Sequence, residues 1–207
     1  AVKLAKLCEG VAAKAKKAKI IVAVQATDIS RVASAVDARL VSVFAQHIDA
    51  NGHGKSTGFV TAEAVKEAGA SGTLLNHAEH KITDIAKRIA TAKAAGLTTV
   101  VCAADIAEAE AIASAKPSPD YIAVEPPELI GGKVSVSDAK PELIAAAVKA
   151  VKEANNRIIV LCGAGINGSR DVRKALQLGT EGILVASSVV LAKDPGKALH
   201  ELINHNH

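Results

Sequence analysis

Short apolar segments rich in β-branched residues alternate along the chain with segments of helical periodicity, and this alternation limits the possible folds most strongly. The apolar segments carry few polar residues, so each suits a strand buried on both faces, as in a parallel sheet covered by helices. They begin roughly every 20 to 40 residues, the spacing of repeated strand–helix units. The seven predicted strands are 20–24, 41–48, 73–76, 98–102, 121–124, 158–162 and 183–186.

Helical segments with recognisable ends fill the intervals between these strands. Residues from about 1 to 17 place apolar side chains every three or four positions. Pro141 suits the first turn of a helix to about Ala154, because proline lacks an N–H that the first turn leaves unbonded. The full count is about eight helices, with a helix first. Three of them are predicted from caps and breakers: Thr83 to Gly96, Ala104 to Lys116 before Pro117, and Ser169 to Gly179.

Two architectures combine parallel strands with helices, an open doubly wound sheet and a closed (βα)8 barrel. A doubly wound nucleotide-binding sheet has a glycine-rich turn after its first strand, and Gln25-Ala26-Thr27 is not such a turn. In a barrel, catalytic residues follow the carboxyl ends of the strands. Polar residues stand at or just after the ends of several predicted strands here: Gln46, Asn76, His77, Glu79, Glu125, Ser187 and Ser188. The sequence therefore predicts an α/β fold, a (βα)8 TIM barrel formed by residues 1–207 as a single domain.

Composition excludes several other classes of protein. Apolar residues make up 49% of the chain, which excludes disorder, and no uninterrupted apolar run reaches the length of a membrane span. Two Phe, one Tyr and no Trp provide no platform for stacking single-stranded nucleic acid, and the net charge of +4 is modest. Three widely spaced cysteines fit neither a disulfide framework nor a zinc site. We therefore expect a cytoplasmic protein without metal or cofactor, nucleic-acid partner or membrane attachment.

Two side chains at predicted strand ends suit proton transfer. Glu125 follows the fifth strand and precedes two prolines, so it could be a rigidly held general base, strengthened by desolvation. An exposed loop carboxylate is equally consistent with its position. His77 ends the third strand and could polarise a carbonyl or move a proton, although a lone histidine there is more often structural. His47, at the end of the second predicted strand, is assigned a structural role.

Two loops late in the chain have the composition of a phosphate site. Residues 163–168, Gly-Ala-Gly-Ile-Asn-Gly, lie between a predicted strand and a predicted helix, and Ala186 and Ser187 follow the next strand. Paired loops of this kind late in a barrel bind phosphate through backbone N–H groups. The same loops suit many barrel enzymes that act on phosphorylated sugars.

Five segments together resemble archaeal-type triosephosphate isomerases over essentially the full length of the chain. They are FAQHID at 44–49, GTLLNHAE at 72–79, AVEPPELIG at 123–131, LCGAGI at 161–166 and LVAS at 184–187. The resemblance implies an isomerase of glycolysis and gluconeogenesis. Its substrate would be a triose phosphate, with glyceraldehyde 3-phosphate and dihydroxyacetone phosphate interconverted by proton transfer through an enediolate and without a cofactor.

The resemblance also implies roles for individual residues. Glu125 matches the catalytic base, His77 the neutral histidine that polarises the substrate carbonyl, and Glu79 the supporting acid. Gln46 matches a glutamine behind the site, and residues 126–134 match the lid that closes over the intermediate. The implied phosphate contacts come from backbone positions in three loops: Ile130, Gly131, Gly165, Ala186 and Ser187.

Four positions depart from the family's pattern. Ala78 stands where the family usually has serine, and His80 stands where it has a basic residue. Lys133 replaces the last glycine of the lid, and Ser188 replaces the glycine that closes the last phosphate loop. Each change could loosen the positioning of a group without removing a catalytic side chain.

Relative to the family's pattern, the chain begins within the first helix, so the predicted barrel is incomplete at its N-terminus. The family's first strand carries an asparagine and a lysine that contact the substrate, and no lysine stands at another matching strand end. We therefore expect an impaired isomerase, and the alternative is a non-catalytic or fragment barrel that keeps a phosphate site. An opening between the strands near Ile20 and Ile183 would expose two sheet edges, so a homodimer or homotetramer is expected.

This expectation predicts the effect of an N-terminal extension. Adding a segment with the family's Asn-aromatic-Lys strand should raise kcat about a thousandfold or more, because these groups stabilise the developing oxyanion. The melting temperature should rise in the same variant. Near-normal turnover by the chain that starts at Ala1, its start verified by intact mass, would contradict the expectation.

Overall fold

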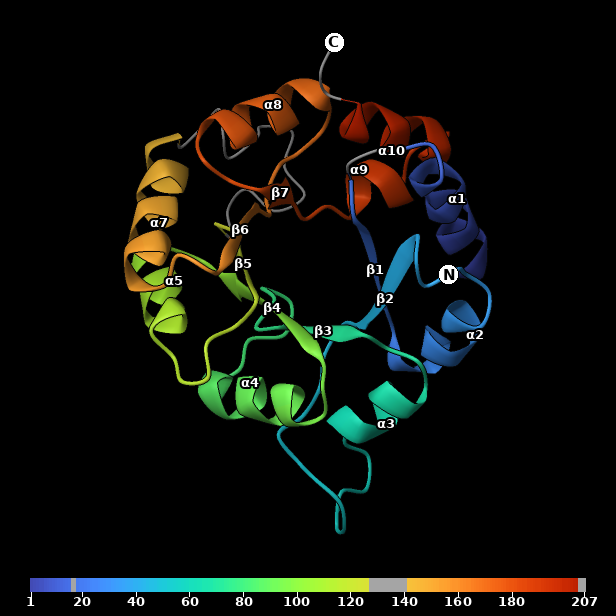
Figure 1. Ribbon diagram of the computed structural model, residues 1–207, viewed down its shortest axis with the longest axis vertical. Coiled ribbons are helices and arrows are strands. Elements are labelled where there is room, and N and C mark those ends of the chain that lie inside the picture. The colour runs from blue at the N-terminus through green and yellow to red at the C-terminus, as the bar shows by residue number, and fades with distance from the viewer. Residues whose placement is uncertain (16–17, 127–140, 205–207) are drawn as a thin grey trace. The chain divides into compact units, whose positions relative to one another are not determined.

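The chain divides into two compact units, and the computed structural model describes residues 1–15, 18–126 and 141–204. Unit 1 comprises Ala1–Leu75 and Lys81–Val100, and unit 2 comprises Asn76–His80 and Val101–His207. Strand β4, Thr98–Ala103, contributes residues to both units. Over the described residues, the strands follow one another in the sheet in chain order, from β1 to β7 (Figure 1).

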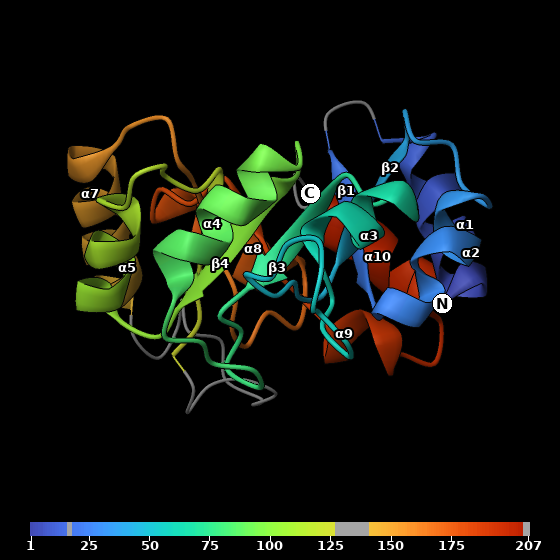
Figure 2. The ribbon, with the colours of Figure 1, turned by 90° about the horizontal axis from the view of Figure 1, so that it is seen from below.

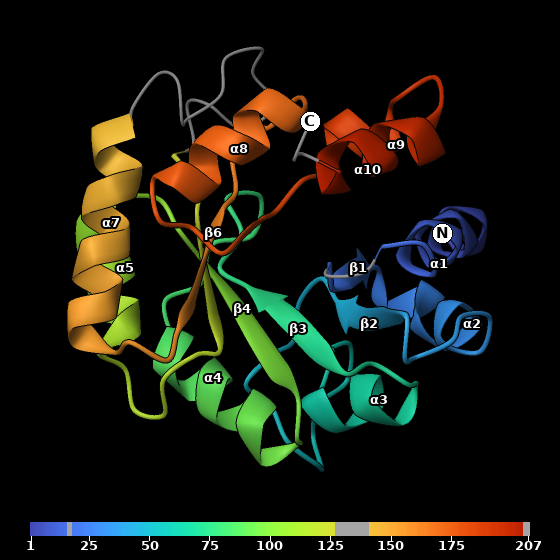
Figure 3. The ribbon, with the colours of Figure 1, turned by 45° about the horizontal axis from the view of Figure 1, so that its top comes forward.

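Unit 1 contains parallel strands that are largely covered by helices. Strand β1 pairs in parallel with β2, which pairs in parallel with β3. Helices α1 and α2 pack on β2, and α4 packs on β3 (Figure 3). All of β3 and most of β2 are buried, as their continuous apolar sequences predict. The described elements are α1 Val2–Ala12, β1 Ile20–Val24, η1 Ala26–Asp28, α2 Ile29–Ala33, β2 Val41–Ala45, α3 Ala62–Glu67, β3 Gly72–Leu75 and α4 Ile85–Ala94.

Unit 2 repeats the alternation of strand and helix. Strand β5 pairs in parallel with β6, which pairs in parallel with β7. Helices α5 and α7 lie side by side (Figure 2), and the alanines that they bury are Ala109 and Ala113 in α5 and Ala147 in α7. The described elements are α5 Ile106–Ala113, β5 Tyr121–Val124, α7 Pro141–Ala154, β6 Ile159–Cys162, α8 Ser169–Gln177, β7 Gly182–Ile183, α9 Ser187–Val190 and α10 Pro195–Ile203.

The predicted elements are present, and α7 has the predicted bounds of Pro141 and Ala154. Strand β5 also agrees with its prediction, whereas β2 ends at Ala45 instead of residue 48. Strand β7 covers Gly182–Ile183 instead of 183–186. The last strand was extended too far because the next residues, although apolar, already lead into α9.

Three predicted helix starts were wrong by one or two residues. Helix α4 follows Asp84 and not Thr83. Helix α5 starts at Ile106, after Asp105 accepts a hydrogen bond from the Glu108 N–H at 2.8 Å. Ser169 is already the first residue of α8. Its preceding turn is closed by Asp171, whose carboxylate accepts the N–H groups of Asn167 at 2.8 Å and Gly168 at 3.2 Å.

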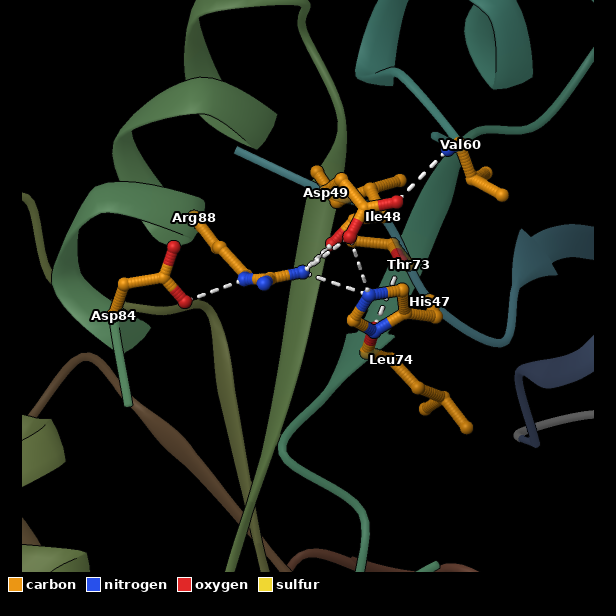
Figure 4. Close-up of polar contacts among 8 residues, drawn as sticks. All are labelled: His47, Ile48, Asp49, Val60, Thr73, Leu74, Asp84 and Arg88. Atoms are coloured by element: carbon orange, nitrogen blue, oxygen red, sulfur yellow. Dashed lines mark hydrogen bonds and ion pairs between the residues drawn. The ribbon is translucent and has the colours of Figure 1, made fainter. Parts of the chain in front are cut away.

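A polar cluster in unit 1 confirms the structural role predicted for His47 (Figure 4). Nη1 of Arg88 donates to the Ile48 carbonyl at 2.8 Å and to Asp49 Oδ1 at 2.9 Å, and lies 2.7 Å from Nε2 of His47. Nε of Arg88 donates to Asp84 at 2.6 Å. Nε2 of His47 also lies 3.3 Å from Oδ1 of Asp49, so the ring contacts both the arginine and the carboxylate.

Asp49 also connects this cluster to Val60, at the other end of the loop 50–59. Its N–H donates to the Val60 carbonyl at 2.8 Å, and its Oδ2 accepts the Val60 N–H at 2.8 Å. The ends of the segment 50–59 are therefore held together by one residue. Burial works to raise the pKa of Asp49, but hydrogen bonds from Val60, His47 and Arg88 outweigh it and leave the pKa below its ordinary value of 3.8.

We expect Asp49→Asn to lower the free energy of unfolding by about 1–2 kcal/mol at neutral pH, because it weakens charge-assisted hydrogen bonds. The pKa of Asp49 is lower in the folded state, so its contribution is complete above about 3.8 and is lost as the pH falls through the folded value. Urea unfolding of both proteins at decreasing pH measures this. The difference between them should shrink below about pH 4, and a difference independent of pH would contradict the assignment.

Candidate active site

Within unit 2, His77 and Glu125 lie close together, although they come from different loops. Nε2 of His77 is 3.9 Å from Oε2 of Glu125. Glu125 directly follows β5, and its N–H donates to the Ala103 carbonyl at 2.7 Å, which continues the strand pairing past the end of β5. The residue is only 3% exposed, so its carboxylate is held at a buried strand end, as predicted. The alternative of an exposed loop carboxylate is wrong.

A backbone hydrogen bond indicates which nitrogen of His77 carries the proton. The Glu79 N–H donates to Nδ1 of His77 at 3.3 Å, so Nδ1 must present a lone pair. The proton of the neutral ring then lies on Nε2, the nitrogen nearer to Glu125. The His77 side chain is 26% exposed, which leaves it open to a small molecule. A neutral histidine in this tautomer can donate a hydrogen bond to a substrate oxygen.

The carboxylate of Glu79 is directed into solvent. Its side chain is 88% exposed, and Oε2 lies 3.8 Å from Nδ1 of His77. The observed contribution of Glu79 to the site is therefore mainly its backbone N–H. A supporting role for its carboxylate stays a prediction.

Gly163 makes room for the Glu125 side chain. A Cβ atom at this position would come within 2.8 Å of Oε1 and 2.9 Å of Cδ of Glu125, and closer still to its Cγ. The Gly163 N–H donates to the Val124 carbonyl at 3.0 Å, so the backbone is fixed where it passes the carboxylate. The sequence assigned this glycine to the phosphate loop, whereas the structure shows it packed beside the candidate base.

Cys162, immediately before this glycine, is fully buried and is not suited to act as a nucleophile. The pKa of its thiol is raised to about 12, chiefly by burial, with a smaller lowering from a hydrogen bond with the Ala164 backbone and a smaller raising from the charges of Asp171 and Glu125. The thiol therefore stays protonated at neutral pH.

The loop predicted to bind phosphate has a defined conformation. Gly165 has φ +65°, in the region that favours glycine, and its carbonyl accepts a hydrogen bond from the Asn167 side chain at 2.7 Å. Asp171 occupies the N–H groups of Asn167 and Gly168, so donors for a ligand must come from other positions. Ala186 and Ser187 are exposed at the start of α9. Ile130 and Gly131, with the predicted lid from residue 127 onward, lie outside the described residues.

Gln46, predicted to stand behind the site, belongs to unit 1. It is exposed, and its side-chain amide donates to the Ala23 carbonyl at 3.4 Å. Its predicted role stays a prediction.

Sequence reasoning missed the part that Glu108 plays in this region. Glu108 lies in the first turn of α5, where Asp105-x-x-Glu108 has the pattern of a helix cap. Its carboxylate accepts hydrogen bonds from the Ala104 N–H at 2.6 Å and from Nδ2 of Asn76 at 2.7 Å. The capping pattern could have indicated the first contact, but nothing local indicates the second.

The described ranges also limit other kinds of site. In residues 1–15, 18–126 and 141–204, no group of three His, Cys, Asp or Glu side chains is arranged to hold a metal ion. No helix in the same ranges is both long enough and apolar enough to cross a membrane.

Comparison with known proteins agrees with this arrangement. The family model for triosephosphate isomerase matches residues 1–206. The triosephosphate isomerase of Methanothermus fervidus is 49% identical over 205 residues, which are 98% of this chain and 90% of the relative. That of Methanosarcina mazei is 45% identical over the same shares.

A solved structure shows the same fold at much lower identity. The crystal structure of the triosephosphate isomerase of Bartonella henselae has a TM-score of 0.68 and 20% identity, covering 89% of this chain and 86% of that one. The predicted TIM-barrel fold is therefore confirmed. With 44–50% identity to several archaeal relatives and a family match along nearly its whole length, this chain belongs to the triosephosphate isomerase family.

Proposed function

We propose that this protein interconverts dihydroxyacetone phosphate and glyceraldehyde 3-phosphate, with Glu125 as the base and His77 as the hydrogen-bond donor. The observation that carries the proposal is the distance of 3.9 Å between Nε2 of His77 and Oε2 of Glu125, in a chain of this family. A substrate held against both groups would present a C–H to the carboxylate and a carbonyl oxygen to the ring.

The chemistry follows from these two positions. The Glu125 carboxylate takes a proton from C1 of dihydroxyacetone phosphate, and the electron pair of the C–H bond forms the C1–C2 double bond of an enediolate. The Nε2–H of His77 stabilises the negative charge that develops on the C2 oxygen. The protonated Glu125 then returns the proton to C2, and a proton moves from the C1 oxygen to the C2 oxygen, so that glyceraldehyde 3-phosphate forms. The burial of Glu125 supports this role, because a water-poor setting strengthens its interaction with the reacting carbon.

For the phosphate group we propose backbone donors at Gly165, Ala186 and Ser187, with Ile130 and Gly131 as further contacts. The left-handed conformation of Gly165 and the exposure of Ala186 and Ser187 support the first three. Backbone N–H groups at loop and helix starts suit an anion, because their dipoles point towards it. We further propose that residues 1–207 form a single domain.

Glu125→Gln should lower kcat by about two orders of magnitude or more, because an amide cannot take the substrate proton. A coupled assay in both directions measures this, and Glu142→Gln, which changes an exposed glutamate of α7, is the matched control.

A phosphorylated two-carbon carboxylate, which resembles the enediolate, should still bind Glu125→Gln through the phosphate loops. Turnover that survives the substitution would contradict the role of Glu125. Binding of the mimic by the parent protein without any turnover would favour the alternative of a non-catalytic barrel with a phosphate site.

Gly163→Ala should lower kcat about a hundredfold, because the added methyl group occupies the space of the Glu125 side chain and displaces the base. Gly168→Ala in the same loop is the control, since its backbone is extended and a Cβ there meets nothing within 4 Å. Equal activity of the two variants would show that the clearance at Gly163 does not matter for catalysis.

We also propose that the protein acts as a homodimer or homotetramer. Three large apolar side chains support this: Phe59, Val190 and Leu191 are between 52% and 79% exposed. Multi-angle light scattering at micromolar concentration should give a mass of two or four chains, and a monomer would contradict the proposal.

A further inference from the structure

The segment Asn76–His80 belongs to unit 2, although the residues before and after it in the chain belong to unit 1. This short segment carries His77, so whatever binds it to unit 2 decides where the ring lies. Asn76 anchors the segment there through its side chain. It is 1% exposed, and its Nδ2 donates to the Cys102 carbonyl at 2.9 Å and to Oε1 of Glu108 at 2.7 Å.

The backbone of Asn76 supports the same interpretation. Its φ is +60°, and among the described residues it is the only one other than glycine with positive φ. Asparagine adopts this conformation more readily than most residues, but a glycine there would do so without cost. Because glycine would suit this backbone better, the hydrogen bonds of the buried side chain explain why asparagine stands at position 76.

Glu108 is an acceptor of the Asn76 side chain and also binds the backbone. One carboxylate oxygen accepts the Ala104 N–H at 2.6 Å, just after β4, and the other accepts Nδ2 of Asn76. Ala103, the last residue of β4, accepts the Glu125 N–H. The carboxylate of Glu108 thus links the backbone beside the candidate base to the residue preceding the candidate histidine.

We propose that Asn76 and Glu108 are positioning residues, a hydrogen-bonded pair that holds His77 at its working distance from Glu125. A glutamate that only capped α5 would need one carboxylate oxygen for this, and its loss would change only the stability of the protein. The second acceptor, used by Asn76, extends its effect to the histidine. As a statement about catalysis this inference rests on the proposed function, whereas the position of the ring can be tested without turnover.

Two substitutions separate positioning from folding. Asn76→Gly keeps the left-handed backbone and removes the amide, and Glu108→Gln leaves one acceptor for two donors. Both should lower kcat about 10- to 100-fold with KM changed less than about twofold, because a small misplacement of a reacting group is costly. Combining Asn76→Gly with Glu108→Gln should cost little more than the worse single change, since both break the same contact.

Asp194→Ala is the matched control for helix capping. Asp194 caps α10 by accepting the Lys197 N–H at 3.0 Å, so its loss should lower the melting temperature and leave kcat unchanged. Unchanged kcat in both Asn76→Gly and Glu108→Gln, in folded proteins, would overturn the proposal.

The imidazole 15N signals of His77, assigned by their loss in His77→Gln, give a second measurement. The parent should show the Nε2–H tautomer, and the two substitutions should shift these signals or mix in the Nδ1–H tautomer. Signals identical to those of the parent would overturn the proposal. If the parent protein does not isomerise triose phosphates, the proposed function fails, and the ring signals still decide whether Asn76 and Glu108 position His77.

Discussion

Parallel strand pairing that continues past the ends of β5 and β6 is the constraint on which the candidate site depends. The Glu125 N–H donates to the Ala103 carbonyl, and the Gly163 N–H donates to the Val124 carbonyl. These two hydrogen bonds bring the residues that follow β5 and β6 to the edge where β4 ends, within unit 2. The base, the glycine that makes room for it and the end of β4 are therefore neighbours because of register, before any side chain contributes.

Side-chain chemistry then distinguishes the two acid–base groups. Glu125 is almost wholly buried, whereas the ring of His77 is partly exposed and has one nitrogen occupied by a backbone N–H. One group is thereby suited to take a proton and the other to donate a hydrogen bond. Neighbouring groups do not compete for these roles, since the thiol of Cys162 stays protonated and the carboxylate of Glu79 lies in solvent.

Much of the fold and the two acid–base residues of the candidate site could be predicted from the sequence. Apolar runs located β1 and β5 to the residue, and the rule that strand ends carry function singled out Glu125 and His77. The role of Gly163 could not be predicted, because it depends on how β5 and β6 pair. The contact between Asn76 and Glu108 joins residues 32 positions apart, and Glu108 has a sufficient local explanation as a helix cap. The start of α4 was misplaced by one residue because Thr83 and Asp84 are both capping residue types, and sequence alone does not rank them.

The proposed reaction requires that Glu125 moves a substrate proton while His77 stabilises an enediolate. Incubation of dihydroxyacetone phosphate with the protein in D2O, followed by NMR, tests it most directly. We expect glyceraldehyde 3-phosphate with deuterium at C2 and recovered dihydroxyacetone phosphate with deuterium at C1, and neither with Glu125→Gln. Isomerisation that proceeds without any deuterium incorporation, or incorporation that persists in Glu125→Gln, would contradict it.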